Sequence, residues 1–202
     1  MTTEYIPAAE QKTAKWSGGT TTELYIYPRT ADYKNRDFLF RLSSATVDDA
    51  VSSFTKLDGY DRTLILLSGS LRLVHKNIRE ATLGQYDKDC FYGGYETTGY
   101  GSGVTDFNLM AKEGCPAKAE LCRMPAVGRM PVSVDRETHA IIGFYALSGD
   151  IRINCGGEKW KLADKDFFTV EKESGEKLEI EALSFPGRLF VLSVLTINET
   201  AV

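Results

Sequence analysis

The sequence has 202 residues, of which 43% are hydrophobic and 26% are charged. This composition is typical of a folded globular protein and excludes a disordered or fibrous chain. Lys and Arg total 24 against 28 Asp and Glu, a net charge of −4, so no broad basic surface is available for nucleic acid or for an anionic membrane. An anionic ligand would have to be held by a few local Arg or Lys residues.

The start of the chain carries no targeting signal, because Met1–Ile6 lacks a basic segment followed by an apolar run. The longest apolar stretch, Leu189–Ile197, is far shorter than the ~20 residues of a membrane-spanning helix. We therefore expect a cytoplasmic protein. The four cysteines include no C-x-x-C pair, and we interpret them as free thiols.

A polar segment rich in Gly and Thr comes first in chain order. Trp16–Leu24 leads into an alternating strand at Tyr25–Tyr27. Because no helix and no Gly-Lys-Ser/Thr follows, a phosphate-binding loop of the P-loop type is excluded. The hydroxyls of Thr20 and Thr21 are candidate ligand contacts, and Trp16 either closes a pocket or fills the end of a barrel.

The next element, Phe38–Ala45, is predicted to be a strand with two polar side chains on one face. Side chains alternate along a strand, so Arg41 and Ser43 share a face opposite the apolar residues. The Arg41 fork can hold a carboxylate by two parallel hydrogen bonds, and Ser43 can add a third donor. The alternative is a structural ion pair of Arg41 with Glu23 or Asp106.

Arg62 stands at the start of an apolar strand, next to Asp61. It either braces the preceding turn by a salt bridge or contacts a ligand. Further on, Asp106 and Asn108 alternate on one strand face. A carboxylate does not hold an anion directly, so we expect Asp106 to orient Arg41 or Arg62.

An internal repeat sets the architecture. Leu67–Leu73 returns as Leu147–Ile153, the residue numbers differing by 80 throughout. A second match follows, in which Asp87-Lys88-Asp89 is aligned with Asp164-Lys165-Asp166. Strands are predicted at Leu71–His75, Ile151–Asn154, Phe167–Val170 and Lys177–Ala182, each bounded by Gly, Asp or Ser.

Helical periodicity is weak, so the fold class is all-β, with two tandem jelly-roll barrels. Residues 1–120 are predicted to form the barrel with a ligand pocket, and residues 121–202 its structural partner. The two histidines, His75 and His139, are not at equivalent repeat positions, and no His-x-His occurs. We therefore expect no metal, no cofactor and no catalytic set.

The N-terminal motifs, taken in order, resemble the HutD family of histidine-utilisation accessory proteins and the related Ves proteins. The motifs that carry this resemblance are Trp16–Leu24, Phe38–Ala45, Ser53-Phe54, Asp61–Leu64 and Asp106–Met110. Thr22 stands where an Arg is common in the family, and Ala111-Lys112 replace an Arg that often follows Asn-Leu-Met.

The resemblance implies a bicupin fold and a non-catalytic role. Members are thought to bind a small carboxylated metabolite of histidine breakdown, such as formylglutamate, and to limit expression of that pathway, whereas Ves proteins are tied to stress responses. The alternative is a cupin enzyme, metal-dependent or metal-free, of the dioxygenase or isomerase class. The expected partner is a small anionic metabolite, with a homodimer as a further expectation. The candidate ligand-binding residues are Arg41, Ser43, Arg62, Thr20, Thr21, Glu23, Asp106, Asn108 and Trp16.

Overall fold

A computed structural model describes residues 1–197, which form 19 β-strands and one short 3-10 turn. The described residues contain no helix that is long and apolar enough to cross a membrane. The chain divides into two compact units. Lys12–Gly114 is called the first barrel below, and Met1–Gln11 together with the described residues after Gly114 is called the second barrel.

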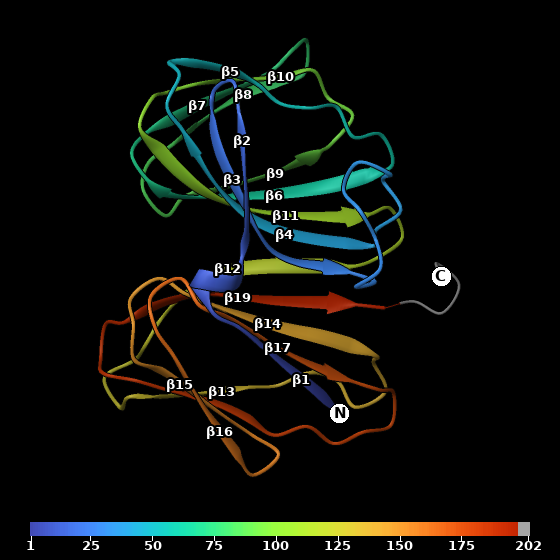
Figure 1. Cartoon of the computed structure of the whole chain (residues 1–202), viewed down its shortest axis with the longest axis vertical. Coiled ribbons are helices and arrows are strands. Elements are labelled where there is room, and N and C mark those ends of the chain that lie inside the picture. Colours follow the sequence, from blue (N-terminus) through green and yellow to red (C-terminus); the bar gives the residue numbers. More distant parts are fainter. Residues whose placement is uncertain (198–202) are drawn as a thin grey trace. The chain divides into compact units, whose positions relative to one another are not determined.

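The first barrel consists of two antiparallel sheets (Figure 1). The six-stranded sheet contains, in spatial order, β2 (Lys12–Trp16), β3 (Gly19–Tyr27), β4 (Phe40–Val47), β11 (Val104–Lys112), β6 (Tyr60–Ser68) and β9 (Lys88–Tyr92). The four-stranded sheet contains β5 (Val51–Ser53), β10 (Thr97–Tyr100), β7 (Leu71–His75) and β8 (Arg79–Leu83). The core of the first barrel contains fully buried side chains from both sheets, among them Leu64, Leu66, Leu73 and Val104.

The second barrel repeats this plan. Its five-stranded sheet contains β1 (Thr2–Ile6), β17 (Phe167–Lys172), β14 (Ala140–Ala146), β19 (Leu189–Thr196) and β12 (Ala117–Arg123). Its four-stranded sheet contains β13 (Arg129–Val132), β18 (Ile180–Leu183), β15 (Ile151–Cys155) and β16 (Glu158–Leu162), and the 3-10 turn η1 (Ala8–Glu10) follows β1. Phe144 packs between Phe168 and Phe190, with ring centroids 6.4 and 6.1 Å away.

The start of the chain belongs to the second barrel, whereas the division expected from the sequence ran between residues 120 and 121. β1 pairs antiparallel with β17, with Tyr5 opposite Phe168. The hydroxyl of Tyr5 donates to Asp166 at 2.5 Å, and the amide of Ala8 donates to the other oxygen of Asp166 at 2.9 Å. The hydrogen bond to Asp166, together with burial, raises the pKa of Tyr5 to about 12, since ionising the phenol would set it against a carboxylate.

The internal repeat is present in the structure, but its second match is shifted from the alignment made on sequence. The Asp87 carboxylate accepts the amide of Gly84 at 2.9 Å, and the Asp166 carboxylate accepts the amide of Ala163 at 2.8 Å. Asp87 thus corresponds to Asp166 and not to Asp164, because each side chain holds the same tight turn. The residue before each Asp, Tyr86 or Lys165, has a positive φ, of 75° and 66°.

Candidate functional site

The first barrel contains a cavity of about 490 Å³. Its lining combines the polar side chains of Arg41, Ser43, Arg62, Asp106 and Asn108 with the apolar or aromatic side chains of Tyr33, Phe54 and Met110. This is a suitable volume for a small metabolite.

Strand register explains why polar residues far apart in the sequence meet in this cavity. Met110 of β11 lies opposite Arg41 of β4 on one side and opposite Arg62 of β6 on the other, so the three form one row across the sheet. Asn108, two residues away on the same face, lies opposite Ser43. The arginines and their polar neighbours therefore share one face.

Arg41 is held on three sides. Its Nε donates to Glu23 Oε2 at 2.8 Å, and its Nη1 donates to Ser43 Oγ at 3.4 Å. The guanidinium carbon lies 4.3 Å from the ring centroid of Tyr33, a cation–π contact. Of the ion-pair partners that the sequence left open, the structure has Glu23.

Arg62 is buried in the cavity wall, with 6% of its surface exposed. Its Nη2 donates to Asn108 Oδ1 at 3.1 Å, and its guanidinium carbon lies 5.0 Å from the Phe54 centroid and 5.4 Å from that of Phe91. Its Nε is buried and has no hydrogen-bond partner among the described residues. Burial lowers the pKa of Arg62 to about 10, so the side chain still carries its charge at neutral pH.

Asp106 is the buried acid of the site. Its carboxylate accepts hydrogen bonds from the Asn108 side-chain amide and from the backbone amide of Ala45. Burial raises the pKa of Asp106 to about 7, although the nearby Arg62 and these two hydrogen bonds act in the opposite direction. Asp106 is linked to Arg62 by hydrogen bonds through Asn108 and also acts on it directly by charge.

The structure brings most of the candidate residues together. Those that line the cavity are Trp16, Thr21, Arg41, Ser43, Arg62, Asp106 and Asn108. Glu23 belongs to the site through its ion pair with Arg41, whereas Thr20 is not among the lining residues and pairs in the sheet with Lys15 and Thr46.

Sequence reasoning gave no role to two aromatic residues of the site. Phe54 belongs to the Ser53-Phe54 motif of the family resemblance, but two alternating residues in a polar segment are too few to predict where its side chain points. Tyr33 lies between β3 and β4, outside any strand, where no periodic pattern exists to find it.

Neither histidine lines the cavity. His75 is 1% exposed; its Nδ1 lies 2.9 Å from Thr97 Oγ1 and its Nε2 lies 2.9 Å from Asp89, which also accepts a hydrogen bond from Arg79. This histidine is therefore part of a buried network in the first barrel.

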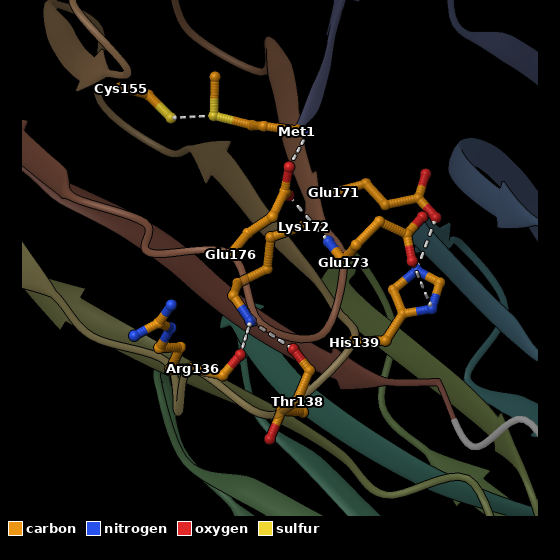
Figure 2. A network of polar contacts seen from close by, with 9 residues as sticks. All are labelled: Met1, Arg136, Thr138, His139, Cys155, Glu171, Lys172, Glu173 and Glu176. Atoms are coloured by element: carbon orange, nitrogen blue, oxygen red, sulfur yellow. Dashed lines mark hydrogen bonds and ion pairs between the residues drawn. The ribbon is translucent and has the colours of Figure 1, made fainter.

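His139 belongs to a separate network in the second barrel (Figure 2). Its Nε2 lies 3.0 Å from Glu171, and its Nδ1 lies 3.5 Å from Glu173. Between these two acids in the sequence, fully buried Lys172 donates to backbone carbonyl oxygens, among them that of Arg136 at 2.9 Å. One ligand atom from each of His139, Glu171 and Glu173 lies within 4.8 Å of the other two, so this cluster is close enough to hold a metal ion as well as to hydrogen-bond the imidazole.

The second barrel has apolar residues where the first has its polar set. Leu66 and Ala146 occupy equivalent places, since each donates its amide to the carbonyl of the turn aspartate. With Leu66 aligned on Ala146, the residue four positions earlier is Arg62 in β6 and Ile142 in β14. The strand registers then place Leu192 of β19 at the position of Asn108, and Phe190 at the position of Asp106. Ile142 and Phe190 are fully buried in the core.

The sequence matches the family model of HutD over residues 8–185. The chain belongs to the HutD family. No curated protein matches it. This HutD-family chain is similar in structure to a conserved protein of unknown function from Pseudomonas aeruginosa PAO1, at 22% identity and a TM-score of 0.83, with 98% of this chain and 100% of the other covered.

Two further solved structures show the same fold. HutD from Pseudomonas fluorescens SBW25 has 18% identity and a TM-score of 0.72, with 98% of this chain and 100% of that chain covered. The bacterial pirin YhhW of Escherichia coli, in complex with nickel(II), has 10% identity and a TM-score of 0.69, with the same coverage. The all-β, two-barrel cupin fold expected from the sequence is thereby confirmed.

Proposed function

We propose that this protein is a non-catalytic binding protein whose first barrel holds a small carboxylate in the cavity between Arg41 and Arg62. Two buried guanidinium groups face one cavity of about 490 Å³, and such groups form strong, charge-assisted hydrogen bonds with a carboxylate. The aromatic side chains of Tyr33 and Phe54 line the same cavity and can pack against an apolar or planar part of the ligand.

The observation that carries this proposal is the buried, unpartnered Nε of Arg62. A buried donor without an acceptor costs about 1–3 kcal/mol, and more when the group is charged. A ligand oxygen would satisfy this donor once the guanidinium turns to present its Nε to the cavity, because the Nε atom itself is covered in the present arrangement. Arg41 differs from Arg62, because its Nε already donates to Glu23 and its Nη1 donates to Ser43.

The composition of the lining supports binding over metal-dependent catalysis. Among the described residues, the cavity is lined by one carboxylate, Asp106, and by no histidine or cysteine. A transition metal needs several such donors converging on one point.

A thermal-shift screen tests the proposal. The probes are formate, acetate, succinate and formylglutamate, each compared with its neutral amide, and sugars and nucleotides complete the set. A carboxylate that binds only the folded state stabilises it by about 2.7 kcal/mol at a hundredfold excess over Kd. We expect carboxylates to raise the Tm and their amides not to. Stabilisation by sugars or nucleotides alone would contradict the proposal.

A further inference from the structure

Asp106 stands at one end of a short chain of buried side chains that begins at Arg62. Arg62 donates to Asn108 at 3.1 Å, and the Asn108 amide donates to the Asp106 carboxylate. All three residues line the cavity and are at most 6% exposed. In such a water-poor environment, a change of charge at one end of the chain is felt strongly at the other.

We infer that the cavity takes up a proton together with its anion, and that Asp106 is the group that receives it. The inference rests on the proposed function, because it concerns the same site. It makes Asp106 a residue that sets the pH range of binding, through Asn108 and Arg62, in addition to lining the cavity.

Charged and titratable groups reach the cavity from several segments. They are Arg62 from β6, Arg41 from β4, Glu23 from β3 through its ion pair with Arg41, Lys15 from β2, and Tyr33 from the segment between β3 and β4. Within the described residues, Arg62 is the charged group joined to Asp106 by the hydrogen-bond chain.

The direction of the coupling follows from these charges. The cation of Arg62 favours the ionised form of Asp106. An anion bound to Arg62 offsets that cation and brings a second negative charge close to Asp106, so ionised Asp106 becomes less favourable. A protonated carboxyl group removes this repulsion and also gains an O–H donor. Because burial already raises the pKa of Asp106 to about 7, the proton is exchanged near neutral pH.

Isothermal titration of the full-length protein with acetate tests the inference. The titration is repeated between about pH 6 and pH 8.5, where acetate stays ionised, in buffers of different ionisation enthalpy, which reports the protons taken up. We expect net proton uptake on binding, and a Kd that rises by up to about tenfold per pH unit above pH 7. In the Asp106→Asn variant, which cannot ionise at this position, both effects should disappear.

Four results would overturn the inference. Acetate binding with a constant Kd and no proton uptake would refute it while leaving the proposed function intact. Unchanged pH dependence in Asp106→Asn would assign the proton to another group. A failure of acetate and every other carboxylate to bind would remove the proposed function and the inference with it. If the Asn variant does not fold, the ¹³Cγ chemical shift of Asp106 in the wild-type protein reports its protonation directly, and a shift unchanged by acetate would contradict the inference.

Discussion

The two cavity arginines differ in what holds them, and this difference predicts how their variants behave. Arg41 has an ion pair with Glu23, whose side chain is 24% exposed, whereas the Nε of Arg62 is unpartnered. In Arg62→Met we expect carboxylate affinity to fall by about 2–5 kcal/mol with no loss of thermal stability. In Arg41→Met we expect weaker binding and a stability loss of about 1 kcal/mol, because Glu23 loses its partner.

Urea unfolding and a carboxylate titration measure the two effects separately. Arg152→Met, at an exposed position of the second barrel, is the matched control and should change neither. If Arg62→Met unfolds the protein or binds as tightly as the wild type, Arg62 is a structural residue and not a ligand contact.

Asp106 makes stability depend on pH in a definite direction. Its pKa is raised from 3.8 to about 7, so the folded state binds the proton more tightly than the unfolded state. Stability from this group is therefore fully present below about pH 4, falls as the pH rises to about 7, and is then constant. Asp106→Asn should gain stability relative to wild type over this range, by at most about 4 kcal/mol. A stability difference that does not change with pH in urea unfolding would contradict this account.

At the residue scale, alternation was enough to place Arg41 and Ser43 on one face, and it did the same for Asp106 and Asn108. Pairing these two sets required the strand register, which places Met110 between Arg41 and Arg62. No local pattern encodes that register, so the hydrogen bond from Arg62 to Asn108 could not be predicted from the sequence.

At the element scale, the hairpin of β2 and β3 depends on two glycines. A Cβ on Gly18 would overlap the ring of Trp16, which lines the cavity. Gly19 has a φ of +154°, and a Cβ there would collide with the carbonyl oxygen of Thr46 on the neighbouring strand. The two glycines thus allow the backbone of the hairpin to lie close to the Trp16 ring and to the neighbouring strand at Thr46.

We expect Gly19→Ala to destabilise the protein by about 1–3 kcal/mol and to weaken carboxylate binding, because the hairpin that carries Trp16 must move. Gly59→Ala is the control: its φ is +78°, but a Cβ there meets no atom within 4 Å. The control should cost less stability in thermal unfolding and leave binding unchanged. Equal effects of the two variants on binding would show that the hairpin does not shape the cavity.

Strands were predictable where apolar residues alternate and not where exposed charges prevail. The strand expected over Leu71–His75 has these bounds in β7. The strand expected over Lys177–Ala182 begins only at Ile180, in β18. At the start of the predicted strand, Lys177 and Glu179 form an exposed ion pair. The backbone pairing of β18 with its neighbouring strands begins only at Ile180.

At the scale of the whole molecule, the repeat was enough to predict two cupin barrels, because each copy carries its own turn aspartate and its own buried core. The pairing of β1 with β17 was not predictable, since Thr2–Ile6 has no counterpart in the repeat. The barrels differ in chemistry: Ile142, Leu192 and Phe190 take the places of the polar cavity residues.

This donor set predicts the metal content of the purified protein. We expect elemental analysis to find well under one equivalent of Fe, Mn, Ni or Zn per chain, because the cavity lining among the described residues offers one carboxylate and no imidazole. Near one equivalent that survives dialysis and is still present in His139→Ala, which removes the imidazole of the other candidate group, would favour a metal-dependent cupin enzyme.

The most direct test of the central claim observes the Nε–H group of Arg62 itself. In ¹⁵N-labelled protein, its resonance is assigned by its absence from Arg62→Met and is followed during titration with acetate. We predict a saturable downfield proton shift, with the same midpoint as the calorimetric titration, because the buried donor gains a charged acceptor. An Arg62 Nε–H signal that stays in place while acetate binds would contradict the account.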